Sequence, residues 1–256
     1  MQVRLTPPAP LSAEPQDLPL SVVYEDEDVL VVDKPAGMVV HPSAGHPDGT
    51  LVNAVLHHLG VEAPALPVLP GNDPTRPGIV HRIDRDTSGV LVIAKHVRAQ
   101  THLAAQFSAH TLTRRYVAVL TGVPSWTERD VETGHARDPT DRRRFAPLAE
   151  APRRARSHFS ITETLHEAVL AQVSLSTGRT HQIRMHARHL GHPIVADPLY
   201  GPARAPRGRL GEAAATLGRH ALHAASLSLR HPADDRIVSW SSPLPPDLMA
   251  LLAALR

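Results

Sequence analysis

The protein has 256 residues, of which 42% are hydrophobic, so it is long enough for one large domain or two small ones with a substantial core. Its 27 Lys and Arg residues nearly balance 25 Asp and Glu residues, and the absence of cysteine excludes disulfides, a thiolate nucleophile, a zinc finger and an iron–sulfur cluster. No apolar run approaches the roughly 20 residues of a membrane span, and residues 1–18 lack the apolar segment of a signal peptide, so we expect a cytoplasmic protein with no membrane partner.

Hydrophobic periodicity predicts helices and strands along the chain. Alternating or continuous apolar runs predict strands, and apolar residues four apart that end at Gly predict helices. The predicted elements are, in chain order, strands at 22–24 and 29–32, a helix at 50–59, a strand at 90–94, a helix at 97–109, strands at 115–120, 159–164 and 168–175, a helix at 180–190, a strand at 222–230 and a helix at 248–255. Strands outnumber helices and are often joined by short loops, which favours an α+β fold with a mostly antiparallel sheet over a doubly wound nucleotide-binding fold.

The chain shows one predicted domain behind a short leader. Residues 1–18 are rich in proline and predict a disordered leader. No Pro-, Gly- or Ser-rich linker divides the remainder, so we expect residues 19–256 to form a single domain.

Arginine is concentrated in two short stretches. All the basic residues except Lys34 and Lys95 are arginines. The first stretch, in a proline-broken segment over 135–158 that predicts a loop, holds Arg142, Arg143, Arg144, Arg153, Arg154 and Arg156, and the second holds Arg204, Arg207 and Arg209. Arginine suits phosphate, so these stretches are candidates for following a nucleic-acid backbone. GC-rich coding explains the overall abundance of Arg, Ala, Pro and His equally well, and both interpretations stay open.

The segment from His81 to Gly89 carries the first candidate site. Asp84 lies between Arg82 and Arg85 in a loop that leads directly into the predicted buried strand. Loop residues held by a rigid strand are a common place for catalysis. The alternative is that Asp84 and Asp86 merely cap the turn that ends at Gly89. A kinase catalytic loop is excluded because the order of the residues is wrong and no Gly-rich phosphate loop is present.

The segment from Thr177 to His186 carries the second candidate site. Arg184 and Arg188 are four residues apart, on one face of the predicted helix. Arg184 is able to pair with a buried carboxylate and keep it ionised, although a solvated basic helix face explains the pattern equally well. His181, His186, His189 and His192 follow closely, but their spacing does not put three on one helical face, so we expect no metal.

Together these segments closely resemble RluA-type RNA pseudouridine synthases. The signature covers His81 to Lys95, and the chain matches the family's other motifs in the expected order. Those further matches are 29–42, 177–184, 191–201 and 221–232. The resemblance spans about residues 20–250 and departs from the family's usual residues at Ala196, where Gly is common, and at His220, where Gln is common.

The resemblance implies that the protein isomerises uridine to pseudouridine in RNA, without a cofactor or metal. It implies that Asp84 is the essential carboxylate, that Tyr116 lies against a uracil flipped out of the stack, that Arg184 pairs with Asp84, and that Arg82 occupies the space that the base vacates. The other residues expected to bind RNA are Arg85, Thr87, Arg179 and His181, which belong to the same two motifs, and Arg142, Arg143 and Arg144.

The RNA target is less sharply indicated than the reaction. The stretch from His41 to Thr50 resembles the branch that modifies large-subunit ribosomal RNA more than the branch that modifies transfer RNA. The few residues before the first predicted strand leave no room for the S4-type RNA-binding domain of many members, so we expect the catalytic domain to select RNA by itself. We also expect a monomer with no obligate protein partner. A non-catalytic RNA-binding protein on this scaffold and a His-rich metal hydrolase are the rival functions.

Overall fold

The computed structural model describes residues 13–62 and 65–256. Its elements are, in chain order, β1 (Ser21–Glu25), β2 (Val29–Lys34), α1 (Leu51–Leu59), β3 (Ser88–Ala94), α2 (Val97–Ala109), β4 (Thr113–Thr121), β5 (Glu128–Gly134), β6 (Ala136–Arg137), β7 (Phe145–Ala146), β8 (Arg154–Leu165), β9 (Ala168–Leu175), α3 (Gln182–His189), α4 (Gly208–Leu217), β10 (Leu222–Arg230), β11 (Ile237–Ser241) and α5 (Pro246–Leu255). No helix in these ranges has both the length and the apolarity needed to span a membrane.

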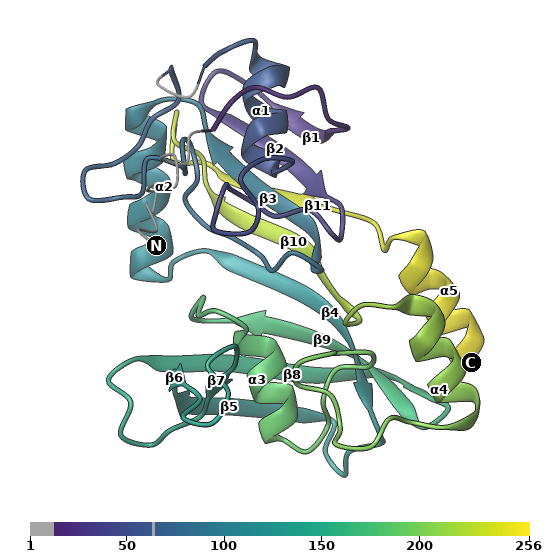
Figure 1. Ribbon diagram of the computed structural model, residues 1–256. Helices are drawn as coiled ribbons and strands as arrows, with labels where there is room; N and C mark the ends of the chain where they lie inside the picture. Colours follow the sequence, from purple (N-terminus) through teal and green to yellow (C-terminus); the bar gives the residue numbers. More distant parts are fainter. Residues whose placement is uncertain (1–12, 63–64) are drawn as a thin grey trace, which may run out of the picture.

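One nine-stranded sheet runs through the described chain, in the order β1-β2-β3-β10-β4-β9-β8-β5, with β11 paired to β10. Only β3 and β10 pair in parallel, and every other neighbouring pair is antiparallel. Figure 1 shows strand β4 passing between the half of the molecule that holds α1 and α2 and the half that holds α3. The predicted α+β fold with a mostly antiparallel sheet is therefore confirmed.

Strand β3 lies at the centre of the core. All seven of its residues are buried, and its alternate side chains enter two different hydrophobic clusters: Leu91 and Ile93 pack in one, and Val90 and Val92 in the other. Burial on both faces explains why β3 is a continuous apolar run rather than an alternating one. The loop that precedes it therefore ends on a rigid support.

Gly89 allows β3 to pair with β10. Its φ of +115° lies in the region that favours glycine, and a Cβ there would lie 2.2 Å from the carbonyl oxygen of Ala224 on β10. A side chain at this position would push the two strands apart. The last residue of the Asp84 motif is thus required by the fold.

The predicted strands and helices are confirmed, but the basic segment 135–158 is not simply a loop. It contains the short hairpin of β6 and β7 and the start of β8. Arg154 and Arg156 lie on β8, where they alternate with buried residues and pair with Glu132 on β5 at 3.2 and 2.8 Å. The sequence missed this because a strand that alternates Arg with small residues has no strong apolar period.

Besides β6 and β7, three elements have no counterpart in the sequence prediction: α4, β5 and β11. Strand β5 is at the end of the sheet order and most of its residues are exposed, so it lacks an apolar pattern. Helix α4 begins at Gly208, which places Arg209 in a helix and not in a second basic loop.

Residues 13–18 pack against α1, although the sequence predicted part of a disordered leader there. Ala13 is 2% exposed, the Gln16 N–H donates to the carbonyl of Asn53, and the Asn53 side chain donates to the carbonyl of Glu14. The partner is a buried polar side chain on α1, which hydrophobic patterning does not detect. The first twelve residues of that predicted leader lie outside the described residues.

Candidate active site

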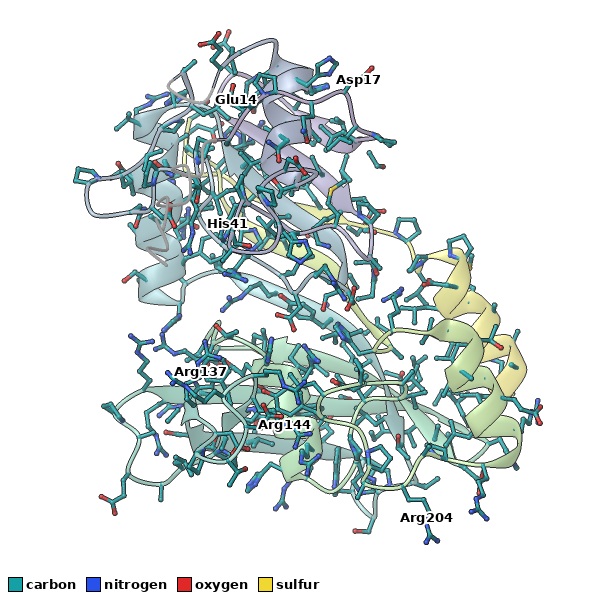
Figure 2. All side chains as sticks on the ribbon, in the orientation of Figure 1. Glu14, Asp17, His41, Arg137, Arg144 and Arg204 are labelled. Atoms are coloured by element: carbon teal, nitrogen blue, oxygen red, sulfur yellow. The ribbon has the colours of Figure 1, made fainter. Side chains whose placement is uncertain are left out.

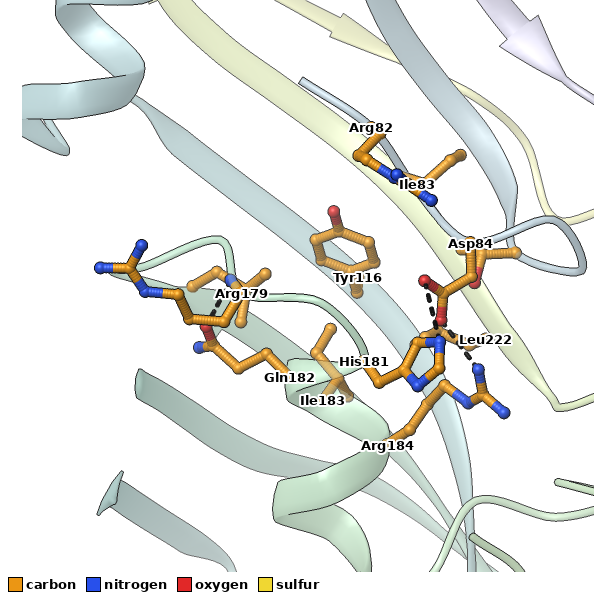
Figure 3. A pocket seen from close by; sticks show the side chains of 12 residues that line it. Arg82, Ile83, Asp84, Tyr116, Arg179, His181, Gln182, Ile183, Arg184 and Leu222 are labelled. Atoms are coloured by element: carbon orange, nitrogen blue, oxygen red, sulfur yellow. Dashed lines mark hydrogen bonds and ion pairs between the residues drawn. The ribbon is translucent and has the colours of Figure 1, made fainter. Parts of the chain in front are cut away.

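A pocket beside β4 gathers residues from segments that are far apart in the chain. Its walls come from the loop before β3, from β4, from the loop and first turn of α3, and from the start of β10 (Figure 3). The residues expected at the site that line this pocket are Asp84, Tyr116, Arg184, Arg82, Thr87, Arg179 and His181. The two sequence motifs therefore meet in space.

Arg184 connects Asp84 to a second carboxylate. Its Nη1 donates to Asp84 Oδ2 at 3.0 Å, while Nε and Nη2 donate to the two oxygens of Asp197 at 2.7 and 2.8 Å. Burial by itself lowers the pKa of Arg184, but the hydrogen bonds and charge of Asp197 and the charge of Asp84 raise the pKa above its usual value. The Asp197 side chain is fully buried, so it holds the guanidinium in place and leaves one N–H directed at Asp84.

This arrangement excludes a solvated basic face for Arg184 and a turn cap for the Asp84 carboxylate. Arg184 is 6% exposed, so it does not belong to a solvated basic face. Within the described part of the chain, the Asp84 carboxylate accepts from Arg184 and caps no backbone N–H. Asp197 belongs to a matching motif, but sequence reasoning assigned it no role.

His181 faces the other oxygen of Asp84. Its Nε2 lies 3.9 Å from Asp84 Oδ1, and its Nδ1 lies 3.1 Å from the hydroxyl of Tyr200. The Phe145 N–H donates to the same hydroxyl at 2.6 Å. The Tyr200 hydroxyl is free to donate to His181 Nδ1, and in that tautomer the imidazole N–H is on Nε2, toward Asp84. Burial lowers the pKa of His181, so the ring is neutral at pH 7.

Tyr116 forms the floor of the pocket. It is 8% exposed, and Figure 3 shows its ring between Arg179 on one side and Asp84 on the other. Residues 116, 118 and 120 are all buried on one face of β4, as the alternation predicts. Burial and the nearby Asp84 charge raise the pKa of Tyr116, so its hydroxyl is protonated at neutral pH.

Three residues to which the sequence analysis assigned no role at the site hold the Asp84 loop. Lys34 is fully buried, and its Nζ donates to three carbonyls, including that of Arg85 at 2.9 Å. Arg219 donates to the carbonyl of Asp86 at 3.0 Å, and His220 Nε2 lies 2.8 Å from the Thr87 hydroxyl. Burial lowers the pKa of Lys34 to about 7. These contacts fix the backbone on the C-terminal side of Asp84.

Four of the predicted RNA-binding arginines are not brought to the pocket. Arg85 turns away and pairs with Asp86 at 3.0 Å, because the tight turn places the two side chains together. The other three, Arg142, Arg143 and Arg144, lie between β6 and β7 outside the pocket. Figure 2 shows Arg144 in the half of the molecule below β4, and Arg204 farther away at its lower edge.

The histidines that follow Thr180 do not form a metal centre in the described residues, which hold no group of three or more potential ligands. His186 is instead fully buried between the hydroxyls of Thr133 and Ser157, at 3.0 and 2.9 Å. Burial lowers its pKa to about 4. His186 therefore connects α3 to strands β5 and β8 in the protein interior.

Comparisons with known proteins agree with this geometry. Residues 28–189 match the family model described as RNA pseudouridylate synthase. The chain belongs to the RNA pseudouridylate synthase family. It is 43% identical to the ribosomal large subunit pseudouridine synthase D of Zymomonas mobilis, over 97% of this chain and 76% of the relative. The identity to the protein of the same name from Xanthomonas campestris is 44%, over 100% of this chain and 75% of that one.

A solved structure shows the same fold. Human RNA pseudouridylate synthase domain containing 1 superposes with a TM-score of 0.69 and 25% identity, covering 91% of this chain and 87% of the human one. The resemblance to RNA pseudouridine synthases is therefore confirmed, and the protein is an isomerase that converts uridine in RNA to pseudouridine. The family match includes Asp84, Tyr116 and Arg184 and ends before Asp197 and His220.

Proposed function

We propose that the protein converts uridine to pseudouridine in large-subunit ribosomal RNA, with Asp84 as its catalytic carboxylate. The observation that carries this proposal is the ion pair of Asp84 with Arg184 inside a pocket that Tyr116 also lines. In the reaction the N1–C1′ bond breaks, the uracil turns, C5 bonds to C1′, and the proton on C5 is lost while N1 gains one. The reaction involves no net oxidation or leaving group, so we expect no cofactor.

Asp84 is suited to each way in which a carboxylate can act here. Attack on C1′, attack on the base and removal of a ribose proton all need an ionised oxygen that reaches the substrate. The guanidinium of Arg184 donates to Oδ2, while Oδ1 faces His181 across 3.9 Å. Tyr116 lies where a flipped uracil would stack, and Arg82 lines the same pocket.

The preference for ribosomal RNA rests on the relatives. The proteins from Zymomonas mobilis and Xanthomonas campestris are both named for the ribosomal large subunit. Transfer RNA is the alternative target. Mapping pseudouridines in both RNA classes from cells with and without the gene decides between them, because only the true target loses a modification when the gene is absent.

We also propose that residues 19–256 act as one catalytic domain, and that the protein works in the cytoplasm as a monomer without an obligate protein partner. In support, the strands that line or border the pocket, β3, β4, β9 and β10, all belong to one sheet. Arg142 and its two neighbours are exposed or half-buried on the β6–β7 hairpin, where they are available to RNA phosphates.

Asp84→Asn tests the catalytic assignment. Asn is nearly the same size but is neither an anionic nucleophile nor a base, so we expect pseudouridine formation to fall below a hundredth of the wild-type rate. Release of tritium from RNA labelled at C5 of uridine measures turnover directly, since that hydrogen leaves. Asp86→Asn is the matched control, because Asp86 lies two residues away and its carboxylate contacts Arg85 outside the pocket. Turnover by Asp84→Asn at a hundredth of the wild-type rate or more contradicts the assignment.

A further inference from the structure

Arg114 differs from the other buried arginines in having no anionic partner. Three arginines in the described ranges are less than a tenth exposed: Arg114 at 7%, Arg184 at 6% and Arg219 at 8%. Arg184 donates two hydrogen bonds to Asp197, and Arg219 donates two to Asp247. Arg114 has no hydrogen bond or ion pair to any described residue, and its buried Nε has no acceptor. A buried guanidinium without a counter-charge is costly to the fold, which points to an anion supplied by a ligand.

The surroundings of Arg114 hold its side chain in a defined place. It precedes Tyr116 by two residues on β4, so both side chains lie on the same face of the strand. Its Cζ lies 5.7 Å from the centroid of the Phe107 ring on α2. The backbone of Gly178 also lies against the guanidinium, because a Cβ at this position would be 2.3 Å from Arg114 Nη1. The guanidinium is therefore positioned before any ligand arrives.

Arg114 opens into a positively charged cleft that continues from the pocket of Asp84. The cleft has a volume of about 510 Å³ and shares Arg82, Tyr116 and Arg179 with that pocket. Arg76 also lines it, and the Arg76 Nε too lacks a hydrogen-bond acceptor among the described residues. No described lining residue of the cleft is an Asp or Glu. Arg76 pairs with Asp73 at 3.9 Å, whereas Arg82, Arg114 and Arg179 have no ion pair with a described residue.

We infer that Arg114 and Arg179 form a phosphate-binding subsite, which holds an RNA phosphodiester next to the uridine that lies against Tyr116. The inference rests on the proposed function, because an RNA strand whose uridine enters the pocket must carry its neighbouring phosphates past this cleft. The planar guanidinium fork matches two oxygens of a phosphate, and such contacts fix the position of a nucleic acid without reading its sequence. The subsite would therefore set the register of the strand.

Arg114→Met removes the charge while it keeps an unbranched side chain of similar reach. We expect it to bind a transcript of large-subunit ribosomal RNA about tenfold more weakly at low salt, since one charge-assisted contact is lost. The slope of log affinity against log salt should fall by roughly 0.7–0.9. Arg115→Met is the matched control, because Arg115 is the next residue on β4, is exposed and loses the same formal charge. It should change the affinity far less.

Thermal stability separates ligand binding from a structural role. Because no carboxylate of the described protein neutralises the Arg114 charge, Arg114→Met should melt at the wild-type temperature or above it. A second probe is RNA with a neutral methylphosphonate at the phosphates that flank the modified uridine. It should bind wild type more weakly than unmodified RNA does, and the difference should be smaller for Arg114→Met, which retains only Arg179 at the subsite.

Two results overturn the inference. One is an Arg114→Met variant that is folded and binds RNA with the affinity and salt slope of Arg115→Met. The other is a wild-type protein whose affinity the flanking methylphosphonates do not change, and this test stands even if Arg114→Met fails to fold. Failure of the proposed function is distinguishable, because wild type would then release no tritium from ribosomal RNA while binding still depended on Arg114.

Discussion

The Asp84 pocket and the β6–β7 hairpin both carry paired charges, but they pair them differently. In the pocket, Arg184 reaches a carboxylate 100 residues away and a second one that is fully buried. In the hairpin, exposed Arg143 pairs with Asp141, two residues earlier, at 2.8 Å. A buried pair formed by distant segments keeps the fixed geometry that catalysis requires. In an exposed local pair, the arginine can readily exchange its carboxylate partner for water or for an RNA phosphate.

Asp197→Asn should produce the largest change in activity after loss of Asp84 itself. Both Asp197 oxygens accept hydrogen bonds, from Arg184 and from the N–H groups of Leu199 and Tyr200, so an amide would place a donor against a donor. We expect a loss of about 3 kcal/mol in stability and about a hundredfold fall in kcat as Arg184 loses its alignment with Asp84. Urea denaturation and single-turnover tritium release measure the two effects.

An exposed ion pair provides the control for Asp197→Asn. Glu163→Gln breaks an exposed ion pair with Arg256 that has the same chemistry, and it should leave both stability and turnover unchanged. A purely structural role for Asp197 would lower stability without lowering kcat well below the melting temperature. Wild-type kcat in folded Asp197→Asn would therefore remove Asp197 from the positioning of Arg184.

His220→Gln should change the pH dependence of stability. Burial lowers the pKa of His220 to about 4 from 6.5. As the pH falls below 6.5, the unfolded chain binds a proton that the folded chain does not bind until about pH 4, so stability is lost over that window. Gln, the residue common in the family here, does not titrate. Between pH 7 and pH 5, the free energy of unfolding of the variant should therefore fall by about 2 kcal/mol less than that of wild type.

Urea denaturation at the two pH values measures this difference. His46→Gln is the control, because His46 is exposed and contacts no buried group of the pocket. Stability curves of wild type and His220→Gln that stay parallel from pH 7 to pH 5 would show that His220 gains a proton in the folded state as easily as in the unfolded chain.

Replacing Arg142, Arg143 and Arg144 together by Gln should have the smallest effect on the folded protein. Their contacts are local, so the melting temperature should not move. The affinity for ribosomal RNA should fall, and the salt slope should decrease by roughly 0.7–0.9 for each phosphate contact that is lost. Titration at several salt concentrations measures both. If the triple variant keeps its affinity and slope, Arg204, Arg207 and Arg209 become the next candidates for the RNA-binding surface.

Local sequence patterns predicted much of the secondary structure and many of the residues that line the pocket. The apolar run of β3 and the alternation around Tyr116 depend on neighbouring residues, and the structure has both as expected. The motifs around Asp84 and Arg184 also identified the two segments that meet. Periodicity failed where an element is polar or alternates charges, as in β5 and at the start of β8.

The pairing of the charged side chains depends on how distant segments pack together. Asp197, Lys34 and His220 act through hydrogen bonds to segments that are distant in the chain or on another element, and no local pattern encodes such a partner. The alternation of β4 that places Tyr116 in the core places Arg114 on the same face. Whether a carboxylate meets that arginine depends on the packing of α2 and of the loop before α3 around it, because the cost of a buried charge is set by everything that surrounds it in space.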